Sequence, residues 1–193
     1  PSTRMTTAAI LREQLYKAKE YMDNWEEYRK NPDEKDKPEF DIRLEALIPV
    51  LKRELIMKVH AHRADDILTA LRIAEEFNLD ITIDHCTEGY MISDILRQKN
   101  VKVILGPLLT DRSKIELRNQ SIEAPGILSK EGIPVAIMTD HPAVPIQYLL
   151  LSASVAVREG MAEEDALKAI TINAAKSAGI DDRVGSLEPG KDA

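Results

Sequence analysis

The sequence ITIDHCTEGYMISDILRQKNVKVIL, residues 81–105, decides the fold. The runs at its two ends are rich in β-branched and apolar residues, whereas the segment between them has the apolar spacing of a helix. Two strands joined by one helix form a βαβ unit, which requires a parallel sheet. Further runs of the same kind flank this unit. The sequence therefore predicts an α/β fold with strands at Ile56–His60, Ile81–His85, Val101–Leu105 and Val135–Thr139.

Helical patterns alternate with these strands and continue after the last one. They are expected at Ala64–Phe77, Tyr90–Lys99, Ala124–Lys130, 145–159 and from Glu163 to just before Gly179. The last pattern opens on two glutamates, which suit a helix N-terminus, and Gly179 is its expected stop. The chain from residue 55 onward is thus predicted to hold four consecutive β/α units.

The N-terminal residues have a different pattern, without strands. A helix is expected over Thr7–Arg29, with one apolar stripe formed by Leu11, Leu15, Ala18, Met22 and Trp25. A polar linker at residues 31–39 separates it from a second helix over Glu39–Arg53. Pro49 either kinks that second helix or marks a first turn. Neither helix carries a chemical motif, so we expect packing or interface surface.

Composition excludes several classes of protein. The 193 residues are 44% hydrophobic and contain one cysteine, which excludes a disulfide framework and a closed cysteine-based zinc site. A net charge of −7 and the lack of a basic face argue against nucleic acid and anionic membranes as partners. Because no apolar run reaches the length of a membrane span, we expect a cytoplasmic protein.

Residues that can bind a metal follow the predicted strands. The four histidines are His60, His62, His85 and His141, and Asp140 completes the set. In parallel sheets, ligands gather at the carboxyl ends of the strands. A single histidine there is often only a hydrogen-bonded polar residue, but the full set indicates a divalent metal site. Imidazole and carboxylate ligands suit Zn, with Mn, Fe or Ni as alternatives.

Other residues near these strand ends have less defined roles. Cys86 follows His85 and points to the opposite face, so we expect a buried small residue rather than a catalytic thiol. Arg63 and Tyr90 lie in loops beside the site, where they either contact substrate or are ordinary polar residues of a surface loop. A nucleotide-binding domain is disfavoured, because no glycine-rich phosphate-binding motif occurs.

Five segments carry a resemblance to a known family. They are VHAHRADDI (59–67), IDHCTEG (83–89), ILGP (104–107), MTDHP (138–142) and ITINAAKSAGIDDRVGSLEPGKDA (170–193). In this order they resemble the amidohydrolase superfamily of metal-dependent hydrolases, in particular its imidazolonepropionase-like and prolidase-like branch. The resemblance implies a partial (β/α)8 TIM barrel, about strands five to eight, preceded by a long helical segment. It divides the chain into residues 1–54, a helical extension, 55–182, the barrel units, and 183–193, the start of a small β-sandwich domain.

The resemblance also implies roles for individual residues. His60 would be a metal ligand on the fifth strand, and His85 a second ligand or a group that touches the hydrolytic water. Asp140 would bind metal and act as general base and then general acid, which makes Asp140 and His85 the catalytic residues. His62 would lie near the substrate or behind the metal ligands. With Arg63 and Tyr90, which are placed beside the site by their loops, it completes the set of candidate substrate contacts. One or two ions would bind in the whole protein.

Two features of the family are missing from the sequence. The His-x-His pair of the first strand and the lysine of the fourth strand are not found, so the chain resembles the C-terminal half of an amidohydrolase. We therefore expect part of a hydrolase that cleaves a C–N bond (amide, dipeptide or cyclic amidine) of a small molecule and is inactive alone. The alternative is a non-catalytic half-barrel that associates with a second copy of itself or with the missing half.

Overall fold

The computed structural model describes residues 3–192, which fall into two compact units. One unit is Pro1–Met57 with Thr69–Asp80, and the other is Lys58–Leu68 with Ile81–Ala193. Pro1, Ser2 and Ala193, which end the expected segments 1–54 and 183–193, lie outside the described residues. Within residues 3–192 no helix is both long and apolar enough to cross a membrane.

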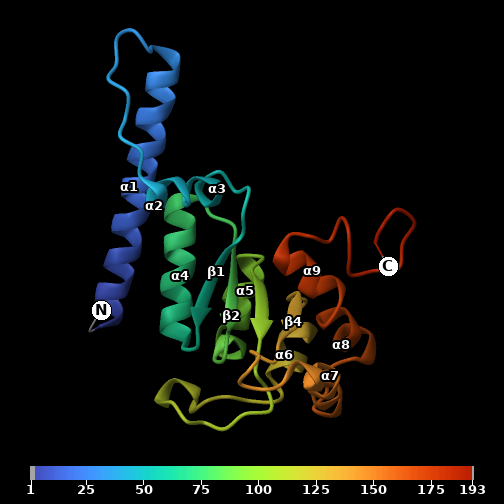
Figure 1. Cartoon of the computed structure of the whole chain (residues 1–193). Coiled ribbons are helices and arrows are strands. Elements are labelled where there is room, and N and C mark those ends of the chain that lie inside the picture. Colours follow the sequence, from blue (N-terminus) through green and yellow to red (C-terminus); the bar gives the residue numbers. More distant parts are fainter. Residues whose placement is uncertain (1–2, 193) are drawn as a thin grey trace. The chain divides into compact units, whose positions relative to one another are not determined.

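The first unit is built on the helix α1, Arg4–Lys30 (Figure 1). It begins at Thr3, whose side-chain oxygen accepts the backbone N–H of Thr6 at 3.1 Å. The helix buries Leu15, Ala18 and Tyr21. Two members of the expected apolar stripe are therefore confirmed as buried, whereas the contribution of Tyr21 was not anticipated.

Polar contacts join α1 to the C-terminal part of the helix α4, Ala64–Phe77. The Nε of Arg12 donates to the Glu76 carboxylate at 2.6 Å, and the Tyr16 hydroxyl donates to the same carboxylate at 2.8 Å. The Tyr16 ring meets the Phe77 ring edge to face, with centroids 4.7 Å apart. These contacts lie within the first unit and hold its helices together.

The expected second helix over Glu39–Arg53 is wrong, because two short helices take its place. These are α2, Ile42–Glu45, and α3, Ile48–Leu51. The Asp41 side chain caps α2 by accepting backbone N–H groups at its start. Pro49 lies in the first turn of α3, which was one of its two expected positions.

The second unit contains a four-stranded sheet within residues 3–192, in the order β1-β2-β3-β4. Its strands are β1 Met57–Ala61, β2 Ile81–His85, β3 Lys102–Leu105 and β4 Val135–Ile137. The strand β3 pairs in parallel with both β2 and β4. The strands thus follow chain order, as expected for consecutive β/α units, and each lies within two residues of its predicted bounds.

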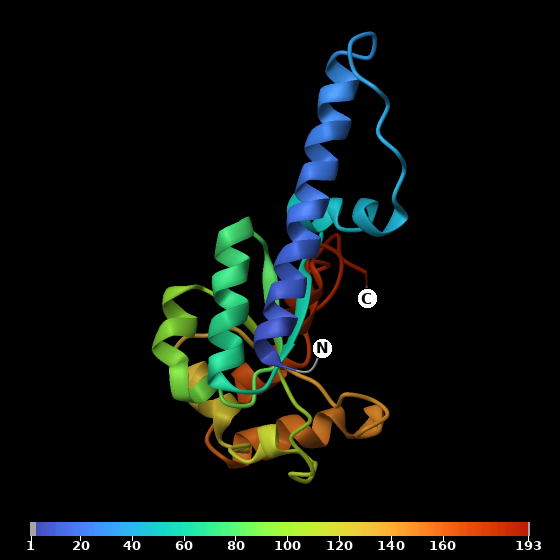
Figure 2. The same cartoon turned by 90° about the vertical axis from the view of Figure 1, so that its left-hand side faces the viewer.

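Helices lie on both sides of this sheet. Figures 1 and 2 show α5, Ser93–Gln98, and α6, Ala124–Lys130, on one side, with α9, Ile172–Ala178, on the other. A short 3₁₀ turn, η1 (Gly89–Ile92), leads into α5. Lys58 and Lys102, at the start of β1 and β3, donate to backbone carbonyls of α9. The strands are thereby anchored at the end where they begin.

The segment after β4 is helical, but it is divided differently from expectation. It comprises η3 Ile146–Tyr148, α7 Leu149–Arg158, α8 Glu163–Ala169 and α9. The expected single helix from Glu163 to just before Gly179 is wrong, because the chain breaks at Thr171 (φ −131°, ψ −100°). The Thr171 hydroxyl donates to the Leu167 carbonyl at 2.6 Å, a bond that competes with regular helix. Gly179, in left-handed conformation, ends α9 as predicted.

Candidate metal centre

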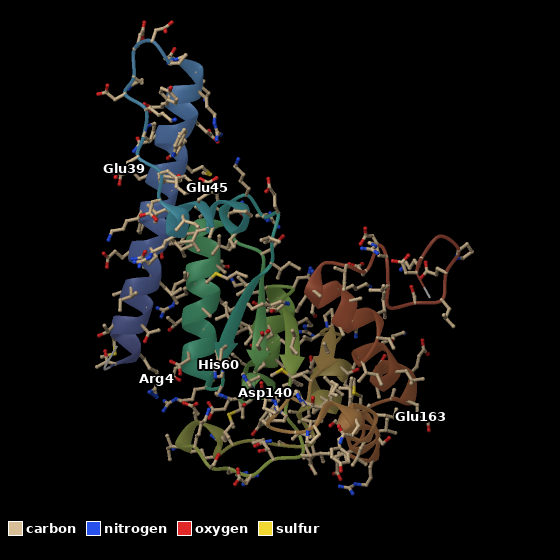
Figure 3. The ribbon with its side chains drawn as sticks, viewed as in Figure 1. Arg4, Glu39, Glu45, His60, Asp140 and Glu163 are labelled. Carbon is tan, nitrogen blue, oxygen red and sulfur yellow. The ribbon has the colours of Figure 1, made fainter. Side chains whose placement is uncertain are left out.

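The residues singled out from the sequence lie where the strands end. His60 is near the end of β1, His85 is the last residue of β2, and Asp140 follows β4. In Figure 3, His60 and Asp140 lie at the same end of the sheet. His85 and Asp140 have left-handed backbones, with φ of 70° and 53°, and Cys86 has φ of 48°. This backbone turns the chain sharply where each strand stops, which costs conformational energy for residues other than glycine.

Three imidazole rings form a compact cluster at this end. The nitrogen atoms that His60, His62 and His85 can offer to a metal ion lie within 4.8 Å of one another. The His60 and His85 ring centroids are 4.1 Å apart, and those of His62 and His85 are 4.5 Å apart. His62 and His85 are buried, whereas part of His60 remains exposed. His62 is therefore itself a member of the histidine cluster.

The tautomer of His85 follows from one hydrogen bond. Its Nδ1 lies 2.8 Å from the carbonyl oxygen of Gly106, at the end of β3. A carbonyl oxygen only accepts, so Nδ1 carries the proton and Nε2 keeps its lone pair. Gly106 is required here, because a Cβ on it would lie 2.1 Å from the Met138 carbonyl oxygen. Histidines that bind metal commonly donate their other ring nitrogen to a carbonyl in this way.

His62 presents an unpartnered nitrogen to the same space. Its Nδ1 is 2.7 Å from the Thr87 hydroxyl oxygen, which fixes the ring. Its Nε2 is buried and has no hydrogen-bond partner among the described residues. Buried polar atoms are rarely left without a partner, so this nitrogen indicates a site for a ligand.

Burial and neighbouring imidazoles lower the pKa of two histidines of the cluster, His60 and His62. Burial, followed by the neighbouring His85 and His60, lowers the pKa of His62 to about 4. The pKa of His60 is lowered by the same causes, since its partial burial removes solvating water and His85 lies beside it. A metal ligand must be deprotonated, so these rings are ready to bind an ion without first losing a proton.

Asp140 and the cluster line one pocket of about 160 Å³. The exposed carboxylate of Asp140 therefore faces the same space as the three rings. Arg63 does not line it and instead forms a salt bridge with Asp65 at 2.9 Å. The fourth histidine, His141, is exposed and also outside this lining. Both statements refer to the described residues.

Tyr90 lies beside the pocket but not in it. Its hydroxyl donates to the Asn119 carbonyl at 3.0 Å, and its ring lines an adjoining hollow of about 520 Å³. The pocket and the hollow share wall residues of the segment between β3 and α6, among them Gln120. Tyr90 is therefore close to the region that a substrate longer than the pocket would reach.

Several residues of this region were not found from the sequence. Glu88, within the quoted motif IDHCTEG, is buried, and its carboxylate accepts the Ala64 backbone N–H and the Asn119 side-chain amide, each at 2.8 Å. The segment between β3 and α6 adds Lys114 to the pocket and places Glu116 beside His62. Glu88 could have been found from the sequence, because it lies in a short motif that already contains His85. The positions of Lys114 and Glu116 could not, because the sequence does not indicate the course of a long loop.

The prediction for Cys86 is confirmed. The side chain is fully buried, and burial raises the pKa of its thiol to about 12. A thiol protonated at neutral pH is a poor nucleophile, which agrees with a packing role.

The donor set fits a divalent transition metal. It combines neutral imidazoles, an unpartnered buried nitrogen and a nearby carboxylate, which together suit zinc or a similar ion more than calcium or magnesium. Two ligand atoms of one zinc ion lie at most about 4.2 Å apart. The three imidazoles, whose nitrogen atoms lie within 4.8 Å of one another, therefore need only small side-chain movements to bind one ion.

Comparison with known proteins places the chain among hydrolases. The amidohydrolase family model matches residues 50–193. The chain is 32% identical to an imidazolonepropionase of Picrophilus torridus over 143 residues, 72% of this chain and 34% of that protein. It is 38% identical to an imidazolonepropionase of Pseudomonas syringae over 80 residues, 39% of this chain and 20% of that protein.

Solved structures show the same relationship. An amidohydrolase from Thermotoga maritima is 47% identical and superposes with a TM-score of 0.95, covering 100% of this chain and 50% of its own. A guanine deaminase of E. coli, 20% identical with a TM-score of 0.52, covers 79% of this chain and 40% of its own, and shares the fold. The chain thus spans half or less of the length of these relatives. Since the family model covers most of its residues, the chain belongs to the amidohydrolase family.

Proposed function

We propose that the chain is the metal-binding, C-terminal half of a hydrolase that cleaves a C–N bond in a small molecule. The observation that carries the proposal is the cluster of His60, His62 and His85 with Asp140 on the same pocket. The sheet would then form strands five to eight of a (β/α)8 barrel. Cyclic amidines and amides are the first candidate substrates, because the curated relatives are imidazolonepropionases.

His60, His62, His85 and Asp140 are the residues that would hold a divalent ion, with zinc as the first candidate. When bound, such an ion supplies Lewis acidity, which allows water to lose a proton near neutral pH. The Gly106 carbonyl keeps the Nε2 of His85 free for this role. Thr87 keeps the His62 ring in place.

Asp140 moves the proton. Its carboxylate accepts the proton of the attacking water and returns it to the nitrogen that leaves. The exposed position of Asp140 on the pocket wall suits this exchange, because the carboxylate can reach both water and substrate. In the intact enzyme, Asp140→Asn should lower kcat at least about a hundredfold.

Zinc titration of the 193-residue chain tests the metal centre. Competition with a chromophoric chelator should show zinc binding by the wild type and a loss of at least about tenfold in affinity for His85→Ala. His141→Ala is the matched control, since it removes an exposed histidine that does not line the pocket. Equal affinities for the two variants, or no zinc binding by the wild type, would contradict the proposal.

An activity assay of the same chain tests whether it contains only part of the residues that hydrolysis requires. Purified residues 1–193 should not hydrolyse amides or cyclic amidines at a measurable rate, even when loaded with zinc. Turnover that survives purification to homogeneity and is lost in Asp140→Asn would show that no further residues are needed.

A second function is favoured by the unpaired strand edges. Within residues 3–192, β1 and β4 each have one hydrogen-bonded neighbour, so each offers an open edge to another chain. Association with a second copy, or with the other half of a barrel, would satisfy these edges.

A further inference from the structure

The segment between β3 and α6, residues 106–123, carries a carboxylate to the histidine cluster. Its middle is a short 3₁₀ turn, η2, Ile115–Leu117, and Glu116 is the central residue of that turn. Its neighbours Lys114 and Leu117 line the pocket of the three histidines. The turn therefore lies against the cluster.

Glu116 faces the unpartnered nitrogen of His62. Its Oε1 is 3.7 Å from His62 Nε2, too long for a hydrogen bond. The Nδ1 of His62 is 2.7 Å from the Thr87 hydroxyl, which can either accept from it or donate to it. In the tautomer with the proton on Nδ1, Nε2 turns a lone pair toward the Glu116 carboxylate, and a cation between the two atoms would remove their repulsion. The Lys114 ammonium, 3.9 Å from the same Oε1, approaches Glu116 without filling that place.

The separation of these two atoms suits a shared metal ion. Two ligands that are each about 2.1 Å from one zinc ion lie about 3.4 Å apart at the tetrahedral angle and at most about 4.2 Å apart. The observed 3.7 Å falls between these limits, so His62 and Glu116 could share one ion at their present separation. Glu116 is not in the group of donor atoms within 4.8 Å of one another that the three histidines form, so an ion shared with the whole cluster requires side-chain movement. Nitrogen and carboxylate oxygen are both ordinary zinc ligands.

We propose that Glu116 is a metal ligand, supplied by the β3–α6 segment to the ion that the histidine cluster binds. The inference rests on the proposed function, since it requires a divalent ion at the cluster. It adds a consequence for the segment itself. The bound ion would restrain the β3–α6 segment, residues 106–123, at the pocket, and the segment would be more mobile without the ion.

Zinc affinity of matched variants is the first test. Chelator competition on the whole chain should show at least about a tenfold loss for Glu116→Gln, which keeps the size of the side chain and removes its charge. Glu123→Gln is the control, because Glu123 belongs to the same segment, is exposed and lines the adjoining hollow instead. It should bind zinc as the wild type does. Far-UV circular dichroism should show equal folding of both variants.

Limited trypsin digestion supplies a second readout that does not depend on affinity. Arg112, Lys114 and Arg118 are exposed cleavage points within the segment. Zinc should slow cleavage there in the wild type and in Glu123→Gln, but not in Glu116→Gln at a zinc concentration that saturates it. Cleavage without zinc should be equal in all three.

The outcomes separate the two proposals. Wild-type affinity and wild-type protection in Glu116→Gln would overturn the role of Glu116 and leave the histidine centre standing. Absence of zinc binding by the wild-type chain would overturn the metal centre and the role of Glu116 with it. A loss confined to Glu116→Gln, in both readouts, is the result that we expect.

Discussion

Gly106 controls the histidine centre through its backbone. Its carbonyl accepts the Nδ1 proton of His85, and its φ of 143° belongs to a region that residues with a side chain avoid. The carbonyl oxygen of Met138 occupies the place where a Cβ would be. A side chain at position 106 must therefore push β3 away from Met138, or move the Gly106 carbonyl away from the His85 ring.

We predict that Gly106→Ala destabilises the chain by about 3 kcal/mol or more and weakens zinc binding. Gly132→Ala is the control, because Gly132 has a φ of 77° but nothing within 4 Å of its absent Cβ. It should cost only about 1 kcal/mol, the price of left-handed backbone. Urea unfolding and chelator competition measure the two effects. Equal losses in both variants would show that the contact with Met138 is unimportant.

The sequence identified some residues of the candidate site and missed others for a physical reason. His60, His85 and Asp140 were found because short β-rich runs end at them, and parallel strands bring such ends together. Glu116 was missed because it lies in a loop, whose course depends on tertiary contacts that no periodicity records. His62 was placed near substrate, since its orientation depends on Thr87, which the pattern alone does not position.

At the scale of elements, Glu88 joins three segments of the second unit. Its carboxylate accepts from Ala64 at the start of α4 and from Asn119 before α6, while its own N–H donates to the His62 carbonyl. Because the Glu88 side chain is buried, the N–H groups of Ala64 and Asn119 would lose their acceptor without it, whereas the backbone bond to His62 would remain.

We predict that Glu88→Ala lowers the free energy of unfolding by about 1–3 kcal/mol. The reason is that the part-buried N–H donors of Ala64 and Asn119 lose their acceptor. Glu123→Ala, which truncates an exposed glutamate, should change the stability by no more than about 0.5 kcal/mol. Urea unfolding followed by circular dichroism distinguishes the two, and similar small losses would refute the bracing role of Glu88.

The elements that the sequence predicted well are those with a strong local period. The bounds of α4 and α6 match the prediction, because amphipathic spacing over one helix needs no tertiary information. The break between α8 and α9 was not predicted, since Ile170 and Ala174 keep the helical spacing across it. Only the conformation of Thr171, a residue able to bond its own preceding turn, interrupts the helix.

At the scale of the whole molecule, the open edges at β1 and β4 predict association. Light scattering should show a dimer or larger species whose share rises with protein concentration. Amide exchange in β1 and β4 should slow as concentration rises, whereas exchange in β3, which is paired on both sides, should not. A monomer at all concentrations, with exchange independent of concentration, would exclude association with a second copy.

The left-handed residues at the strand ends have a consequence for the history of this sequence. His85, Cys86 and Asp140 each hold a backbone conformation that glycine adopts without strain. Exchange of Asp140 for glycine would relieve about 1 kcal/mol, so mutation and drift favour losing the aspartate wherever its chemistry is not used. Under the proposed function, a descendant that no longer used the Asp140 carboxylate would therefore gain stability by losing it, and retention of Asp140 would mark the lineages in which the proposed chemistry is still selected.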